Sequence, residues 1–443
     1  MKIFKIILFG ILLLFITGFS VLATINLPKL DIISGYSAKM MNSSVFVAQR
    51  APEYTDSTDV NMDLVRLADD RVDYENASTE ADVYGLKKRT AIYREGLGSV
   101  LINDDYDPDI PYLQPKRSVA SDTISFPYGN GKPQDTIFSH IDYKELDKVV
   151  ESAFDSISKT RSVLVLYKNH IIAEKYAEGF NENSLLLGWS MTKSILSTLY
   201  GILQYEGKLN IHDVTGLKEW QEDERKEITY NHLLHMSSGL EWEEDYSKIS
   251  DATKMLFLEA DMSHSQLIKP LVAEPESVFN YSSGTTNLLS GILKREFKDQ
   301  QSYLDFPYTH LLDKISMNSA LIEADLESNY VGSSYGWANT RDWAKFGLLY
   351  LHKGNWNGDQ IFDHYWAEYV STPAKASKGR YGAQFWLNAE GYMPDVPRDV
   401  YYADGFQGQR VFIIPSHDMV VVRMGLDHID FNSFLKGIID AVE

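Results

Sequence analysis

The stretch Gly188-Trp189-Ser190-Met191-Thr192-Lys193 decides how the rest of this chain is interpreted. Ser190 and Lys193 are three residues apart, so on a helix they lie on one face. Burial of that helix would remove water from Lys193 and lower the pKa of its amine, which favours its action as a base. A serine hydroxyl is a weak nucleophile that needs such a base. The stretch therefore predicts a nucleophilic serine activated by a lysine.

The surrounding sequence places Ser190 at the beginning of a packed helix. Residues 162–176 read as two β-strands joined by a tight turn at Lys168-Asn169. After Ser190 an apolar stripe follows helical spacing, and it ends near Gly207. The N–H groups of the first turn would then stabilise negative charge that develops near Ser190. The same Ser-x-x-Lys spacing recurs at 156–159 and 433–436, so the spacing alone does not single out Ser190. Its position at the beginning of a packed helix does.

Composition fixes the broad class of the protein. The chain has 443 residues, of which 44% are hydrophobic and 23% charged, as in globular proteins. Its 62 acidic and 42 basic residues give a formal net charge of −20. That negative charge would repel the phosphate backbone of a nucleic acid, so nucleic-acid binding is not expected.

The N-terminus resembles a targeting segment. Lys2 and Lys5 precede an apolar run over residues 6–25, and Val21-Leu22-Ala23 offers a site for cleavage before Thr24. Residues 1–25 are predicted to be a signal peptide or a membrane anchor, because the run is also long enough to cross a bilayer. The protein is thus expected to be exported to the periplasm or cell envelope, with residues 6–25 as its attachment to the inner membrane if they are retained. The chain has no cysteine, which excludes disulfides and a lipid-anchored lipoprotein.

The rest of the chain is predicted to form two parts. Residues 26–125 are interpreted as an N-terminal extension packed on the main domain, with short strands at 45–47 and 90–93. Residues 126–443 begin with a helix over 143–159 and the hairpin, and they end in strands and a helix. The expected fold is α+β, an antiparallel β-sheet flanked by helices with a mostly helical lobe. The helices of that lobe and the C-terminal elements are predicted at 231–236, 252–259, 286–297 and 340–352, then 410–414, 419–423 and 432–442.

Three segments in this order form a pattern: Ser190-x-x-Lys193, then Tyr281-Ser282-Ser283, then Ala403-Asp404-Gly405. The pattern resembles the serine β-lactamase and penicillin-binding-protein superfamily. The class C β-lactamase-related branch, with its esterases, D-amino-acid peptidases and 6-aminohexanoate-dimer hydrolases, is the most similar. The resemblance covers about residues 126–443, and supporting segments of the same branch stand at 233–240, 338–347 and 381–387.

The resemblance implies a role for each segment. Ser190 would be the acylated nucleophile, Lys193 its base, and Tyr281 the group that relays a proton to the leaving group. The backbone N–H groups of Ser190 and Phe406 would form the oxyanion hole. Ser283, in the third place of the Tyr-x-Asn motif, would support the site by a hydrogen bond to Lys193.

The third segment departs from the β-lactamase pattern, in which Lys-Thr-Gly or His-Thr-Gly helps to hold an anionic group of the substrate. Gly405 is retained, since a strand that lines an oxyanion hole needs close backbone approach. Asp404 would repel the carboxylate of a β-lactam if it faces the site. Asp404 and Trp189 are predicted to line the substrate pocket. The chain is therefore expected to be a serine hydrolase that acts on a small-molecule amide or ester.

Two other functions stay open at this point. One is a true β-lactamase or a D-peptidase that acts on cell-wall peptides, and the other is a non-catalytic, penicillin-binding-like protein. A metal site is not expected, because His232 and His235 lack a third ligand at a suitable spacing. No cofactor is implied. The aromatic residues Tyr335, Trp337 and Trp343 are interpreted as core.

Overall fold

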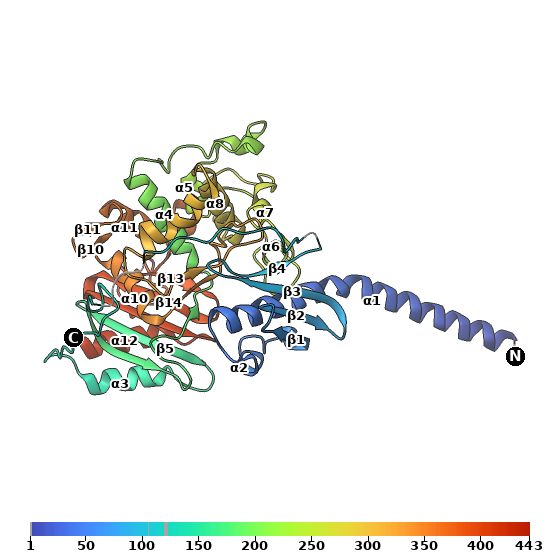
Figure 1. The fold of residues 1–443 in the computed structure, drawn as a ribbon, viewed down its shortest axis with the longest axis horizontal. Coiled ribbons are helices and arrows are strands. Elements are labelled where there is room, and N and C mark those ends of the chain that lie inside the picture. Colours follow the sequence, from blue (N-terminus) through green and yellow to red (C-terminus); the bar gives the residue numbers. More distant parts are fainter. Residues whose placement is uncertain (1, 105, 119–122) are drawn as a thin grey trace. The chain divides into compact units, whose positions relative to one another are not determined.

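The computed structural model describes residues 2–104, 106–118 and 123–443 of the chain, and Figure 1 shows their fold. The chain forms two compact units, and neither is continuous in sequence. Unit 1 comprises Met1–Tyr93, Ser99–Tyr106 and Glu243–Ala260, and unit 2 comprises Arg94–Gly98, Asp107–Trp242 and Asp261–Glu443. The division into domains at residue 125 stays a prediction.

Unit 1 is built around one long helix and a meander of four strands in the order β1-β2-β3-β4. The helix α1 packs against this sheet, and the alanines Ala38, Ala81 and Ala91 are fully buried at their contact. Small side chains there let the helix and the sheet approach closely. The elements of unit 1 are α1 (Lys2–Asn42), η1 (Ser43–Val47), α2 (Pro52–Ser57), η2 (Val65–Leu67), β1 (Ala68–Asp73), β2 (Ser78–Val83), β3 (Leu86–Arg94), β4 (Gly98–Ile102) and α6 (Asp251–Leu258).

The beginning of unit 1 differs in one element from the sequence prediction. The predicted strand at 45–47 is wrong, because the segment Ser43–Val47 is a π-helical turn that continues α1. Val45 and Val47 are buried there. Continuity with the helix and burial therefore override the β-propensity of Val-Phe-Val. Within the part of the chain that the structure describes, no helix has the length and apolar character needed to cross a membrane.

Unit 2 contains the main sheet, whose strand order is β12-β13-β14-β15-β5-β6 with every pair antiparallel. The elements that form and flank this sheet are α3 (Tyr143–Ser152), β5 (Thr160–Tyr167), β6 (His170–Tyr176), α10 (Thr340–Leu351), β12 (Trp386–Leu387), β13 (Tyr401–Gly405), η7 (Phe406–Gly408), β14 (Gln409–Ile414), η8 (Pro415–His417), β15 (Met419–Gly425) and α12 (Phe431–Val442).

The remaining elements of unit 2 are mostly helical. Three short strands among them form a small sheet in the order β7-β9-β8. These elements are β7 (Leu186–Leu187), α4 (Thr192–Tyr205), η3 (Lys218–Trp220), η4 (Glu224–Glu227), α5 (Tyr230–Leu234), α7 (His264–Leu267), α8 (Ser283–Arg295), α9 (Gln300–Pro307), η5 (Tyr308–Leu312), β8 (Leu321–Ile322), β9 (Gly336–Ala338), β10 (Asn355–Trp356), β11 (Asp359–Gln360), α11 (His364–Ser371) and η6 (Lys375–Ser377).

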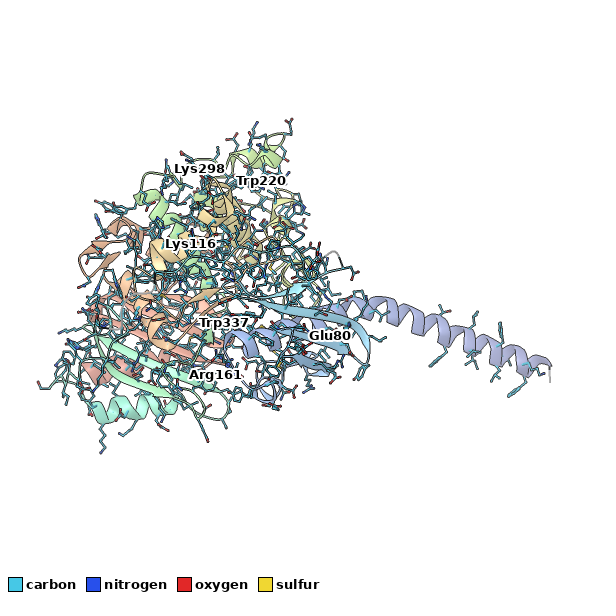
Figure 2. All side chains as sticks on the ribbon, viewed as in Figure 1. Glu80, Lys116, Arg161, Trp220, Lys298 and Trp337 are labelled. Atoms are coloured by element: carbon cyan, nitrogen blue, oxygen red, sulfur yellow. The ribbon has the colours of Figure 1, made fainter. Side chains whose placement is uncertain are left out.

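The main sheet is buried on both faces because alternate side chains of its strands enter two different cores. Val163 and Val165 of β5 pack with α3 and α12 on one face. Leu164 and Leu166 belong to the larger core on the other face, which α10 covers. Trp220, which belongs to that larger core, and the buried Trp337 are labelled in Figure 2. The fold is therefore α+β, an antiparallel sheet flanked by helices with a helical lobe, as predicted.

The hairpin before the site has the predicted turn. Lys168 (φ 47°) and Asn169 (φ 67°) are both in the left-handed region, as a two-residue type I′ turn requires. The helix before the hairpin is shorter than predicted: it ends at Ser152, whereas the sequence predicted an end at residue 159. The carboxylate of Asp155 accepts the N–H groups of Ile157 and Ser158 there, which supplies a turn in place of another helical one.

A buried ion pair anchors α10 to the core. Lys345 and Asp342 are both 1% exposed, and Lys345 Nζ donates to Asp342 Oδ1 at 2.8 Å. The other oxygen of Asp342 accepts from the backbone N–H and the hydroxyl of Ser319. Lys345 Nζ also donates to the Asn130 side chain and the Ser316 carbonyl. Every charge in this network is thus satisfied by a partner.

Lys345→Met is expected to lower the free energy of unfolding by about 3–5 kcal/mol, because it leaves the buried Asp342 carboxylate without its cation. Urea denaturation measures the change. The matched control is Lys353→Met, which removes an exposed lysine that lies 3.7 Å from Glu368 and is expected to change stability by less than about 0.5 kcal/mol. Equal urea midpoints for the two variants would contradict the structural role of the pair.

Candidate active site

Ser190 lies in a tight turn directly before α4. Trp189, the residue before it, has φ 49°, a conformation that bulky residues rarely adopt. The Thr192 hydroxyl donates to the Trp189 carbonyl at 2.7 Å and accepts the Gly336 N–H at 2.8 Å. Thr192 therefore fixes the strained turn to β9. The helix begins at Thr192, so Ser190 lies just outside it and at its N-terminal end.

Lys193 is 1% exposed and its amine contacts three oxygen atoms from separate segments. Nζ lies 3.1 Å from Ser190 Oγ, 3.0 Å from Ser283 Oγ and 2.8 Å from the Ser333 carbonyl oxygen. The two side chains are thus in contact, although Ser190 lies in the turn before the helix and only Lys193 is in α4. The distance of 3.1 Å is short enough for proton transfer between them.

The second segment supplies its side chains to this position for separate reasons. Ser282 caps α8 by accepting the Thr285 N–H at 2.8 Å, which directs the next residue toward Lys193. Ser283 is fully buried and makes the predicted contact with the lysine. The centroid of the Tyr281 ring lies 5.0 Å from Lys193 Nζ. The ring is also in contact with Trp386, with the two centroids 5.5 Å apart.

Two groups that lie behind Lys193 were not predicted from the sequence. Asn287 Oδ1 accepts the Ser333 N–H at 3.1 Å, and Ser333 is the residue whose carbonyl accepts from the lysine. Asn287 and Ser283 are four residues apart on α8, so they lie on one helix face. That spacing is the signal from which Asn287 could have been found. The backbone carbonyl of Ser333 leaves no such signal, because any residue carries one.

The third segment approaches the serine through Gly405. A Cβ atom on Gly405 would lie 2.1 Å from the Gly188 carbonyl oxygen, so the two backbones touch where a side chain cannot fit. The rings of Trp189 and Phe406 meet edge to face with centroids 5.6 Å apart. Residues 188–190 and 405–406 are therefore adjacent, although more than 200 positions separate them in sequence.

Asp404 pairs with an arginine of the neighbouring strand. Arg410 Nη1 lies 2.7 Å from Asp404 Oδ1, and about a quarter of the Asp404 side chain is exposed. Burial raises the pKa of the Asp404 carboxyl, and the positive charges of Arg410 and Lys193 oppose that rise. The Asp404 carboxylate therefore interacts with the positive charges of both Arg410 and Lys193.

The histidines considered as metal ligands have structural surroundings. His232 Nδ1 accepts the Thr229 N–H in a capping box that begins α5. His235 stacks on Tyr369, and burial lowers its pKa to about 4. Among the described residues no group of three or more histidine, aspartate or glutamate side chains is placed to hold a metal ion.

The sequence of this chain matches one known protein family. Residues 153–425, which include all three segments, match the family described as Beta-lactamase. The chain belongs to the Beta-lactamase family. This membership agrees with the resemblance on which the three segments were singled out. No curated protein sequence gives a significant match to this Beta-lactamase family member.

Solved structures share the fold of this Beta-lactamase family member. A Bacillus anthracis protein with the working description 6-aminohexanoate-dimer hydrolase has a TM-score of 0.57 at 19% identity over 74% of this chain and 90% of its own. EstCE1, described as a hydrolase with promiscuous acyltransferase activity, has a TM-score of 0.53 at 14% identity over 68% and 97%. A penicillin-binding protein homolog from Caulobacter crescentus has a TM-score of 0.52 at 14% identity over 70% and 100%.

Gly405→Ala is expected to lower the free energy of unfolding by about 1–3 kcal/mol, because the added methyl group must push β13 away from Gly188. Chemical denaturation gives the value. The control is Gly179→Asn, at a position with φ +84° and open space around the Cβ, where asparagine tolerates the backbone conformation. Parent-like stability of Gly405→Ala would show that the close approach is not required.

Proposed function

We propose that the protein is a serine hydrolase that cleaves an amide or ester through a covalent acyl-enzyme on Ser190. In this proposal Lys193 is the base, Tyr281 relays the proton to the leaving group, and Ser283 holds the lysine in place. The backbone N–H groups of Ser190 and Phe406 form the oxyanion hole. The reaction needs no cofactor in this scheme.

The chemistry proceeds in two halves. Lys193 takes the proton of Ser190 as Oγ attacks the substrate carbonyl, and the oxyanion of the tetrahedral intermediate is held by the two N–H groups. When the intermediate collapses, the proton passes through Tyr281 to the departing nitrogen or oxygen. Water then attacks the acyl-enzyme and gives up a proton to Lys193. Lys193 passes that proton to Ser190 Oγ as the bond to the acyl group breaks and the acid is released.

The single observation that carries the proposal is the position of the Lys193 amine. It lies within hydrogen-bond distance of Ser190 Oγ and of Ser283 Oγ, which come from the first and the second segment. A nucleophile, a base and a group that orients the base are the parts that such catalysis needs. Family membership supports the same chemistry, since the Beta-lactamase match includes all three segments.

The proposed substrate is an amide or ester that carries no carboxylate group next to Asp404. The charges of the third segment support this restriction. In the β-lactamase pattern a cation and a hydroxyl occupy the first two places of the third segment, where this chain has Ala403 and Asp404. Arg410 is already bonded to Asp404, so it is not available to a substrate anion. The names of the structurally similar hydrolases, 6-aminohexanoate-dimer hydrolase and EstCE1, fit this substrate class.

Ser190→Ala and Lys193→Ala are expected to abolish both labelling by a fluorophosphonate probe and turnover of p-nitrophenyl acetate, because they remove the nucleophile and its base. The loss in kcat should be at least about 10³-fold, as expected when an activated nucleophile loses a catalytic partner. Labelling is followed by in-gel fluorescence and turnover by absorbance.

The matched control uses a second serine–lysine pair at the same spacing on a helix. Ser433→Ala and Lys436→Ala in α12 are expected to leave labelling and turnover unchanged. Persistent labelling of Ser190→Ala would place the nucleophile elsewhere. Hydrolysis of nitrocefin at a rate comparable with that of the ester would contradict the proposed selectivity against β-lactams.

The proposal includes export and attachment to the inner membrane through residues 6–25. Its support is the apolar run itself together with side chains of α1 that face outward, such as Phe4, Leu8 and Phe15, which are 69%, 58% and 72% exposed. Apolar side chains in such number are stabilised when lipid replaces water around them.

The full chain is expected to sediment with membranes and to be released by detergent but not by high salt. A variant that begins at Thr24 should stay in the supernatant, because it lacks the apolar run. Fractionation followed by activity measurement checks both forms, and equal ester turnover by the two would show that the segment serves location only. Recovery of the full chain in the supernatant would contradict the attachment.

A further inference from the structure

The segment 405–409, which comprises the turn between β13 and β14 and one strand residue on each side, is held by side chains of three residues. Its carbonyl groups, from residue 405 to residue 409, all accept hydrogen bonds from Arg410, Gln409 or Arg423. Gln407 (φ 61°) and Gly408 (φ +78°) are both left-handed, so the turn is not a regular one that its own backbone would stabilise. Its shape is therefore set by these side chains.

Arg410 makes the contact that matters most for the proposed chemistry. Its Nη1 donates to the Gly405 carbonyl at 3.0 Å and to the Gln409 carbonyl at 2.9 Å. The same nitrogen contacts Asp404 Oδ1 at 2.7 Å. Arg410 is 8% exposed, and its guanidinium group packs over the ring of Phe431 at 4.9 Å. The guanidinium group is thus fixed from several directions.

The Gly405 carbonyl and the Phe406 N–H belong to one peptide group. A trans peptide is planar, and its C=O and N–H bonds point in opposite directions. An arginine that holds the oxygen therefore determines where the N–H points. A charged donor on the oxygen also polarises the peptide and strengthens the N–H as a donor on the other side.

We propose that Arg410 is a positioning residue that orients and polarises the Gly405–Phe406 peptide, so that the Phe406 N–H serves as an oxyanion donor. Asp404 acts through Arg410 in this scheme, by holding its guanidinium group. This assigns Asp404 a role in the oxyanion hole in place of contact with the substrate. The inference rests on the proposed function, since it concerns the oxyanion hole of that same reaction.

Arg423, a residue of β15, completes the support of the turn. It is fully buried, and its Nη1 donates to the carbonyls of Gln407 and Gly408 at 3.1 Å each. Its Nη2 donates to the Ser158 carbonyl and to Thr160 Oγ1, both at 2.7 Å. Burial lowers the pKa of Arg423 to about 9, which leaves it charged at neutral pH. Arg423 fixes the far side of the turn and Arg410 the side next to Ser190.

The test compares Arg410→Gln, Arg410→Lys and Asp404→Asn with the parent in three measurements. These are kcat and KM for p-nitrophenyl acetate, inhibition by phenylboronic acid, and thermal unfolding. Phenylboronic acid is chosen because its tetrahedral adduct on a serine places an anionic oxygen in the oxyanion hole. Acylation and deacylation both pass through an oxyanion, so kcat reports the hole whichever step limits the rate.

For Arg410→Gln, kcat is expected to fall about tenfold to a hundredfold, less than the roughly 10²–10³ that removal of a donor costs. The inhibition constant of phenylboronic acid should rise by a similar factor while KM changes little. Arg410→Lys keeps the charge but cannot bridge the same acceptors, so it should recover only part of the loss. Asp404→Asn should produce a smaller loss in the same direction.

The matched control is Arg341→Gln, which breaks a different partly buried arginine–carboxylate pair, in which Arg341 makes two bonds of 2.7 Å to Glu174. This control should lower the unfolding temperature without changing kcat or boronic acid inhibition. Parent-like kcat and inhibition in Arg410→Gln, or in Arg410→Lys if the former does not fold, would overturn the inference. Absence of Ser190-dependent turnover in the parent would instead overturn the proposed function, and the inference with it.

Discussion

The arrangement of unit 2 around Ser190 depends on the hydrogen bonds of one buried amine. Lys193 is held by a hydroxyl from the turn before α4, a hydroxyl from the beginning of α8, and a carbonyl from the segment before β9. Burying an amine is costly unless its hydrogen bonds are satisfied. The three segments must therefore meet at one position for the fold to be stable, and the same requirement assembles the proposed site. Stability and chemistry are set by the same contacts here.

The two buried lysines of unit 2 show how surroundings separate a structural role from a chemical one. Lys345 pairs with the carboxylate of Asp342, and such a neighbour favours the charged ammonium form. The hydrogen bonds described for Lys193 go to hydroxyl and carbonyl oxygens, although the charge of Asp404 also acts on it. Both residues stand near the beginning of a helix, so helix position alone does not distinguish them. The nature of the acceptor does.

The periodicity of apolar residues in the sequence predicted the positions of several helices and of one hairpin. The hairpin with its turn at Lys168-Asn169 and the helices α5, α8 and α10 were predicted to within a few residues. The Ser190–Lys193 contact was also expected, but Ser190 makes it from the turn before α4 and not from the helix. Contacts made by backbone carbonyl groups could not be predicted, because every residue has one. The carbonyls of Ser333 and Gly405 are the main examples. The segment 45–47 was misjudged because its β-propensity was local, whereas the preceding helix continued through it. The pairing of Asp404 with Arg410 was not predicted, because the two residues lie on neighbouring strands.

The segment Glu243–Ala260 delays the completion of unit 1 while the chain is synthesised. It contributes α6 to unit 1, where Phe257 packs on Tyr36 with ring centroids 5.4 Å apart, yet it is made after more than a hundred residues of unit 2. Domains generally fold as units while the chain is synthesised from its N-terminus. Unit 1 cannot be completed until residue 260 has emerged, and by then the Ser190 segment is already present. Recombination could not exchange either unit by a single crossover, because each unit is interrupted in sequence by the other.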